Sequence, residues 1–149
     1  MQYTEGSLGR VFVLRLEEGE VLNDTIENFA REQKISHGLA FFLGGSGDGS
    51  KVVVGPEPNR EAIIPMIHAL KGAQEVLALG TLIPNDAGEP LLHMHAASGR
   101  EGKATVGCTR AGVEVWLVGE VVVLEILGAA AAQRKKDPGT GFQLLGISK

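Results

Sequence analysis

Cysteine is almost absent from this sequence, and so are the long apolar segments that mark membrane proteins. The single cysteine, Cys108, excludes a disulfide within one chain and is typical of a protein in a reducing compartment. The longest apolar runs near the C-terminus, VVVL and GAAAA, are far shorter than the ~20 residues that span a bilayer. The N-terminal stretch MQYTEGSLGR lacks the apolar core of a secretion signal. These absences predict a cytoplasmic protein with no membrane association.

An excess of positive charge is missing as well. The chain has 14 Lys and Arg residues against 18 Asp and Glu residues, which gives a formal net charge of −4. Such a protein has no overall positive field to attract a phosphate backbone, so DNA is an unfavoured partner. The one short basic cluster, Arg134 to Lys136, is followed directly by Asp137, and we expect it to be a solvated stretch.

Glycine, by contrast, is abundant, with 21 residues in a chain of 149. The glycines are scattered singly between apolar runs, which predicts short strands separated by tight turns. The glycine-rich stretch GGSGDGS (residues 44–50) lacks the Gly-Lys-Ser/Thr end of a phosphate-binding loop, and a predicted strand follows it. Its Asp48–Gly49 pair is typical of a hairpin turn, so we interpret the stretch as a turn. No Gly-x-Ser-x-Gly motif marks a nucleophilic serine.

Hydrophobic periodicity predicts one helix among several strands. Over residues 21–33, Leu22, Ile26 and Phe29 recur with the spacing of an amphipathic helix. Alternating or continuous apolar residues predict strands over 9–20, 38–45, 51–55, 74–84, 90–97 and 103–109. Residues 113–128 are apolar on both faces and are read as one broken strand or a hairpin.

The remaining segments are less regular. Residues 59–71 are ambiguous, although Pro65 argues against a continuous helix, and the tail after residue 130 is expected to cross the surface. The whole chain, residues 1–149, is therefore predicted to form a single α+β domain. Its mostly antiparallel sheet has about seven strands and is accompanied by one main helix.

Two of the four histidines stand two positions apart in the predicted strand PLLHMHAA. Because side chains alternate across a strand, His93 and His95 project from one face, while Leu92 and Met94 project from the other. Neutral imidazole is the commonest protein ligand of transition metals. The pair therefore indicates a metal site, or alternatively a partly buried histidine pair beside an inert thiol.

The next strand, KATVGCT, brings Cys108 back beside this pair through the connection SGREG. Cys108 shares the histidine face only if the hairpin loop contains an even number of residues, two or four. His93, His95 and Cys108 would then form a three-ligand site for zinc, or another divalent transition metal, with one open position. Water, His37 or His68 could fill that position, although each of these histidines is otherwise an ordinary surface or hydrogen-bonded residue.

Several motifs together resemble the PPC domain, the plant and prokaryote conserved domain. GRVFVLRLEEGE resembles the first strand of this family, and GLAFFLGGSGDG its glycine-rich second strand. PLLHMHAASGREG matches its His-x-His-Ala motif, VGEVVVLEIL its C-terminal strand and RKKDPGTGFQLL its tail. The resemblance runs from Gly9 to about Leu145, almost the whole chain.

The resemblance implies a compact α+β subunit that assembles as a homotrimer. Family members often carry a third histidine after a glycine in the strand that follows His-x-His, and here Cys108 stands after Gly107. Plant members also carry AT-hooks, but this chain has no Arg-Gly-Arg-Pro sequence.

Three functions follow from these patterns. The first is a homotrimer that binds a metal through His93, His95 and Cys108 and takes a small-molecule ligand there. The second is a DNA-binding or regulatory module, which the charge disfavours. The third is an oligomeric scaffold that binds partners, for which the doubly apolar strand at residues 120–127 argues. No residue is assigned a catalytic role.

Overall fold

A computed structural model describes residues 1–58 and 63–148 of the chain. Its helical elements are α1 (Leu22–Glu32) and the short 3-10 helix η1 (Thr109–Ala111). Its strands are β1 (Ser7–Glu17), β2 (Gly38–Ser46), β3 (Lys51–Pro56), β4 (Pro65–Ala69), β5 (Gln74–Pro84), β6 (Pro90–Arg100), β7 (Lys103–Cys108), β8 (Val115–Leu127), β9 (Ala132–Lys136) and β10 (Gln143–Ile147).

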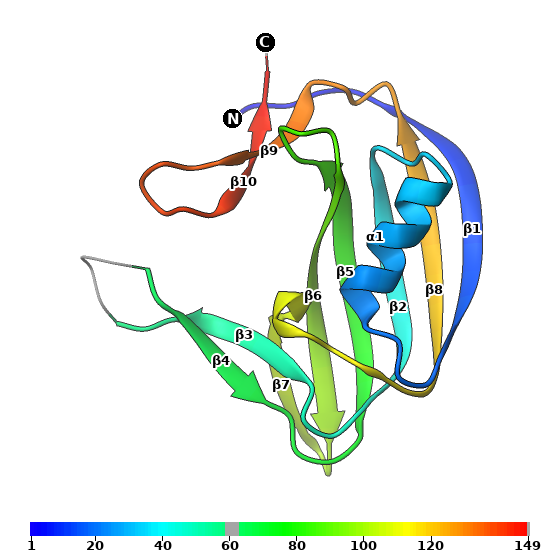
Figure 1. Ribbon diagram of the computed structural model, residues 1–149, viewed down its shortest axis with the longest axis vertical. Helices are drawn as coiled ribbons and strands as arrows, with labels where there is room; N and C mark the ends of the chain where they lie inside the picture. The colour runs from blue at the N-terminus through cyan, green and yellow to red at the C-terminus, as the bar shows by residue number, and fades with distance from the viewer. Residues whose placement is uncertain (59–62, 149) are drawn as a thin grey trace.

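Eight of these strands form one antiparallel sheet in the order β1-β8-β2-β5-β6-β7-β3-β4, and β9 pairs with β10 in a separate two-stranded sheet. Helix α1 lies across one face of the sheet, and the hairpins β3–β4 and β9–β10 project from the same side of the molecule (Figure 1). The predicted α+β fold with a mostly antiparallel sheet and one main helix is confirmed. The predicted count of about seven strands left out β4, β9 and β10.

The face of the sheet under α1 forms the hydrophobic core. Alternate residues of successive strands are buried there, among them Leu16, Ala40, Phe42, Met94 and Val121. Ile26 and Ala30 of the helix pack against this face, as the amphipathic pattern predicted.

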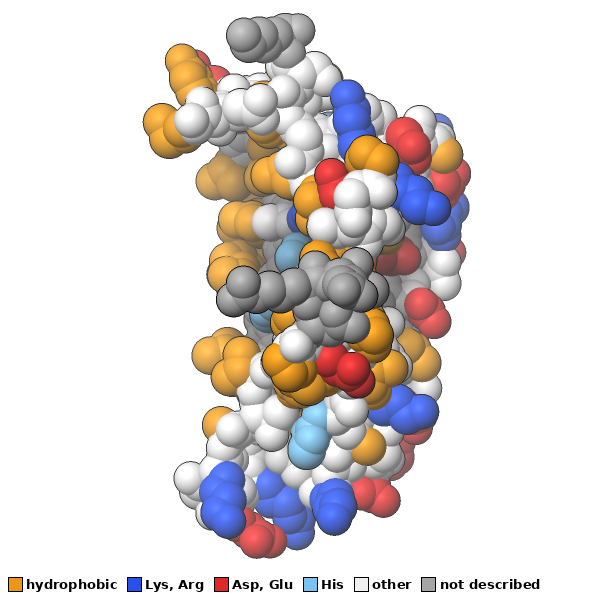
Figure 2. Space-filling model, turned by 90° about the vertical axis from the view of Figure 1, so that its left-hand side faces the viewer, with side chains coloured by type: hydrophobic (Ala, Val, Ile, Leu, Met, Phe, Trp, Pro, Cys, Tyr) orange, Lys and Arg blue, Asp and Glu red, His pale blue; other side chains and the backbone are white. Residues whose placement is uncertain are grey.

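The opposite face has no helix, and we call it the open face. It carries large apolar side chains in neighbouring strands that are exposed, namely Val11, Val13, Phe41, Leu43, Leu77, Leu79 and Val106. Seen edge-on, hydrophobic side chains gather along one side of the molecule and charged side chains along the other (Figure 2). The strands of this sheet are therefore apolar on both faces over much of their length.

A glycine-rich turn connects β2 to β3, but it does not close the hairpin that the sequence predicts. The predicted turn over GGSGDGS is confirmed only for its second half: Gly44, Gly45 and Ser46 end strand β2, and the turn follows at Asp48 and Gly49, where Gly49 has a φ of 81°. This turn is not a hairpin, however, because β2 pairs with β5 and β8 whereas β3 pairs with β4 and β7. The segment 113–128 is one strand, β8, with an irregularity where Leu117 has a φ of 59°.

The ambiguous segment contains a strand, β4, which begins at Pro65. Its side chains are exposed along its length, so it has no amphipathic pattern to predict it from. Residues 59–62, the start of the ambiguous segment, lie outside the described residues.

One ion pair lies on the core face, at the end of α1. The buried carboxylate of Glu125 accepts hydrogen bonds from Nε and Nη2 of Arg10, each at 2.8 Å, and from the backbone N–H of Arg10. Arg10 also donates to the carbonyl of Gln33, which follows the helix. These hydrogen bonds from Arg10 lower the pKa of Glu125 to about 2.

Among the residues that the structure describes, no helix has the length and apolar character needed to cross a membrane.

Candidate metal centre

Strand β6 carries the two histidines on the open face of the sheet. Leu92, Met94 and Ala96 of the same strand are buried in the core, and His93 and His95 are exposed on the other side. The alternation predicted from the sequence is therefore confirmed. Both imidazoles stand where a ligand can reach them.

The β6–β7 hairpin places Cys108 beside these histidines. Arg100 pairs with Lys103, which leaves a connection of two residues, and the register brings Cys108 directly opposite His95. Glu101 and Gly102 both have positive φ, 54° and 74°, as a type I′ turn requires. The loop has an even number of residues, and Cys108 lies on the histidine face.

The three potential ligand atoms lie close together. The imidazole nitrogens of His93 and His95 and the sulfur of Cys108 are all within 4.8 Å of one another. The two Nε2 atoms are 3.2 Å apart, and the rings are nearly perpendicular, at 88°. Two Zn–N bonds of ~2.0–2.1 Å at a tetrahedral angle separate their nitrogens by about 3.3 Å. The donor set and its spacing fit a transition-metal ion, although a hydrogen bond between the imidazoles also accounts for the 3.2 Å contact.

The surroundings of His93 favour the neutral form of its imidazole. Partial burial lowers the pKa of His93, and the positive charges of Arg134 and Arg110 and the neighbouring His95 lower it further. A neutral imidazole is the form that binds a metal ion.

Close packing fixes the end of strand β7 at the site. A Cβ on Gly107 would lie 2.8 Å from the carbonyl oxygen of Val53 and 2.9 Å from Cβ of Val52, so only glycine lets β3 approach this closely. Val53 pairs with Cys108 as a result, and the thiol is 3% exposed.

Buried hydrogen bonds fix the position of Thr109, the residue that follows Cys108. The hydroxyl of Thr109 donates to Oδ1 of Asn23 at 2.6 Å and lies 3.2 Å from the carbonyl of Met94. Asn23 in turn donates to the carbonyl of Leu92. Asn23 of helix α1, directly and through Thr109, thus fixes the backbone on both sides of His93.

The two other histidines do not belong to the cluster. His37 is buried, and its ring nitrogens lie 2.9 Å from the hydroxyl of Ser36 and 2.8 Å from the carbonyl of Ala132. Those contacts occupy both nitrogens, so the expectation that His37 could be a fourth ligand is wrong for this conformation. His68 lies in β4 and lines a different hollow with Lys71 and Arg100. Within the described residues, the only group of this kind is His93, His95 and Cys108.

Two arginines at the site could not be predicted from the sequence. Nη1 of Arg110 donates to the sulfur of Cys108 at 3.5 Å, and its guanidinium lies 5.3 Å from the centre of the Phe142 ring. Arg134 is 6% exposed and donates to the hydroxyl of Thr81 at 2.8 Å. The prediction that the basic cluster 134–136 is solvated is therefore wrong for its first member, because β9 turns this side chain inward.

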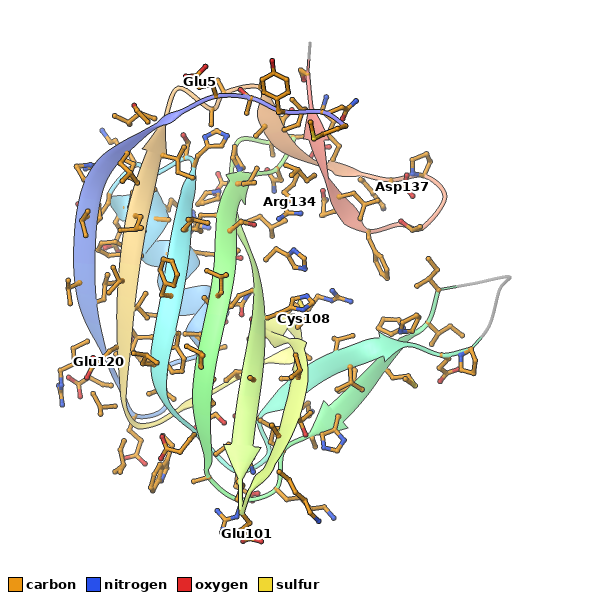
Figure 3. The ribbon with its side chains drawn as sticks, turned by 180° about the vertical axis from the view of Figure 1, so that it is seen from behind. Glu5, Glu101, Cys108, Glu120, Arg134 and Asp137 are labelled. Carbon is orange, nitrogen blue, oxygen red and sulfur yellow. The ribbon has the colours of Figure 1, made fainter. Side chains whose placement is uncertain are left out.

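Figure 3 shows Arg134 and Cys108 on the open side of the sheet, near the space between the hairpins β3–β4 and β9–β10. Glu101 lies far from them, at the tip of the β6–β7 hairpin.

A cavity of about 510 Å³ opens beside the cluster. His95, Cys108 and Arg110 form its polar wall. The rest of its lining is mostly apolar and consists of Val53, Val54, Gly55, Pro56, Ile63, Pro65, Val106, Gly107 and Phe142. A ligand of the cluster would therefore face a space large enough for a small organic molecule.

Comparison with known proteins places these features in a family. The chain has 27% identity with a plant- and prokaryote-conserved protein from Pyrococcus horikoshii, over 100% of this chain and 98% of that one, with a TM-score of 0.80. It has the same identity with a metal-containing protein from Archaeoglobus fulgidus, over 97% and 99% of the two chains, with a TM-score of 0.81.

A curated relative, the bifunctional protein GlmU of a Synechococcus strain, is 32% identical over 146 residues. The chain spans only about a fifth of its length, 21%. The model of the Plants and Prokaryotes Conserved (PCC) domain matches residues 3–127, which include β1 to β8 and all three residues of the cluster. The chain therefore belongs to the PCC domain family, the one that its sequence motifs resemble.

Proposed function

We propose that this protein binds a divalent transition metal ion, with zinc preferred, through His93, His95 and Cys108. The observation that carries the proposal is the convergence of two imidazole nitrogens and one thiol sulfur within 4.8 Å. These residues come from two strands whose register is fixed by a two-residue turn, so the cluster is built into the sheet.

The donor atoms favour zinc over magnesium or calcium. Nitrogen and sulfur are poor ligands for hard cations, which prefer oxygen. The metal-containing protein of Archaeoglobus fulgidus supports a metal in this fold, since it covers nearly the whole of this chain. The thiol must also stay reduced to bind the ion, which fits a reducing compartment such as the cytoplasm.

Three protein ligands leave a fourth position of a tetrahedral ion open, as in zinc sites that bind a substrate or water. Neither His37 nor His68 belongs to the cluster, and the neighbouring cavity borders His95 and Cys108. A bound zinc ion would supply a Lewis acid at this cavity. The centre is therefore proposed to bind a small molecule rather than to serve folding alone.

We further propose that the subunits assemble as a homotrimer through the open face of the sheet. Seven large apolar side chains are exposed on that face in the single chain, and a patch of this kind marks an interface. A second copy of the chain would bury them. This proposal also draws on the family resemblance.

The metal proposal is tested by elemental analysis of the native protein beside a His95→Ala variant. We expect about one zinc per chain in the native protein and none in the variant. The fold should persist, because His95 is exposed and the core lies on the other face. His68→Ala is the matched control, since His68 is an exposed strand histidine outside the cluster, and it should keep its zinc. Equal metal content in the native protein and both variants would contradict the proposal, as would a protein that takes up no zinc.

A Cys108→Ser variant tests the third ligand. We expect it to bind zinc at least tenfold more weakly, because a serine hydroxyl is a much poorer zinc ligand than a thiolate. Competition with a chromophoric chelator measures the affinity, and an unchanged value would show that the thiol does not bind the ion.

A further inference from the structure

The cavity beside the candidate metal centre has two chemically different walls. One wall consists of His95, Cys108 and Arg110. The other is apolar over most of its area and includes Val53, Pro65 and Phe142. A ligand that fills this space must combine a polar head with an apolar part.

The polar wall requires the head to be negatively charged. Among the described residues, Arg110 forms no ion pair with a carboxylate, and neither does Arg134. Arg134 is 6% exposed, and its Nε atom has no hydrogen-bond partner. Its charge lies close enough to Cys108 and His93 to act on both. Arg134 does not itself line the cavity, but burying its guanidinium without a counter-ion is costly, so an anion bound close to Cys108 and His93 would stabilise the protein.

The metal ion adds to this positive charge. A divalent ion retains one positive charge after pairing with the Cys108 thiolate, and neutral imidazoles do not reduce it. No Asp or Glu is found among the described residues that line the cavity. The two arginines and the ion together would therefore attract an anion.

The size of the cavity limits the rest of the ligand. A space of about 510 Å³ lies within the range of roughly 300–1,000 Å³ that small organic ligands occupy. The Arg110 guanidinium lies over the Phe142 ring, and both side chains line the cavity, where the planar fork of N–H donors matches a carboxylate.

From these observations we propose that the centre binds a monocarboxylate with a short apolar chain. The carboxylate takes the open metal position and accepts hydrogen bonds from Arg110, and the chain lies against Val53, Pro65 and Phe142. The inference rests on the proposed metal function and adds the substrate class. Arg110 acts as a positioning residue for the head of the ligand.

The test uses hexanoate as the probe, with calorimetry on the zinc-loaded full-length protein. Acetate, hexanamide and inorganic phosphate are the comparison compounds. We expect hexanoate to bind at least tenfold more tightly than acetate, because each buried methylene contributes up to about fourfold in affinity. Hexanamide has the same chain without the charge and should bind at least tenfold more weakly than hexanoate.

Two variants separate the roles of the walls. Arg110→Gln should weaken hexanoate binding about tenfold or more when it is measured on protein that carries one zinc per chain. Phe142→Ala should reduce the preference for hexanoate over acetate severalfold. Arg31→Gln is the matched control, because Arg31 is an exposed arginine on α1, across the sheet from the cavity, and this variant should bind like the native protein.

The outcomes distinguish this inference from the metal proposal. If the protein takes up no zinc, the proposed function and this inference both fail. If zinc binds but hexanoate binds no better than hexanamide, only the inference fails. Tighter binding of phosphate than of hexanoate, or unchanged hexanoate binding in the Arg110 variant, would also overturn it.

Discussion

The two faces of the sheet have similar hydrophobicity in sequence but different surroundings in the structure. Phe41 and Phe42 are neighbours in β2, yet Phe42 is 0% exposed under α1 and Phe41 is 38% exposed on the open face. Apolar alternation therefore indicates which residues form a strand, but it does not show which face a helix covers. The face without a helix is the one that carries the histidine pair and the cavity.

The largest expected effect comes from truncating this pair of phenylalanines. Phe42→Ala removes a fully buried ring and should lower the free energy of unfolding by about 3–5 kcal/mol. Phe41→Ala should lower the free energy of unfolding of the subunit by less than about 1 kcal/mol. Any further loss of stability in this variant should come from weaker association between subunits. Urea unfolding at two protein concentrations separates these terms, since only an assembly term depends on concentration. Equal losses in the two variants would show that the faces do not differ in this way.

Assembly of the proposed homotrimer is expected to respond to a charge on the open face. Leu77→Lys places a lysine where a 61%-exposed leucine lies, and we expect it to convert the proposed homotrimer to monomers in sedimentation. Glu32→Lys, at the end of helix α1 and across the sheet from the open face, is the control and should sediment like the native protein. A native protein that sediments as a monomer at micromolar concentration would rule out the homotrimer.

The core face carries a buried charge at Glu125, and its effect should depend on pH. Arg10 lowers the pKa of Glu125 from the usual 4.5 to about 2 in the folded protein. The stabilisation is therefore complete above the unfolded pKa and is lost as the pH falls from about 4.5 to about 2. The free energy of unfolding should fall less steeply over this interval in Glu125→Gln than in the native protein. Glu120→Gln, an exposed glutamate in the same strand, should follow the native curve, and an equally steep curve for the Glu125 variant would contradict the assignment.

The weakest interaction that we expect is with duplex DNA. The net charge is −4, so the release of counterions from DNA supplies little affinity. At physiological salt we expect binding no tighter than the non-specific range of ~10⁻⁴–10⁻⁶ M in a fluorescence anisotropy titration. Nanomolar, sequence-selective binding would favour a regulatory function and would require a basic surface in the assembled protein.

Much of the fold and of the metal cluster could be predicted because both depend on local periodicity. The positions of His93 and His95 follow from the alternation of β6, and that of Cys108 follows from the length of one short turn. Two of the strands that were not predicted have weak local patterns. Strand β4 is exposed on both faces, so its residues need not alternate between apolar and polar, and β9 has the mostly polar sequence Ala-Gln-Arg-Lys-Lys.

The arginines of the cavity were missed for a different reason. Arg134 stands in a charged run that is indistinguishable from a solvated stretch, and its buried guanidinium donates a hydrogen bond to Thr81, 53 positions away in the chain. Phe142 and Arg110 meet across 31 intervening residues. Contacts of this kind form only when segments distant in the sequence pack together, and no local sequence pattern predicts them.

The two-residue connection between β6 and β7 has an evolutionary consequence. Surface turns are usually where related proteins gain or lose residues without harm. Here an inserted residue that shifts the pairing of β7 by one position would place Cys108 on the opposite side of its strand, away from His95, while leaving a hairpin that could still fold. The turn lies at the far end of the strands from the histidines, yet its length is as much a part of the ligand set as the thiol. A register shift at a turn that touches none of the three residues would therefore remove the proposed metal site from a descendant of this chain.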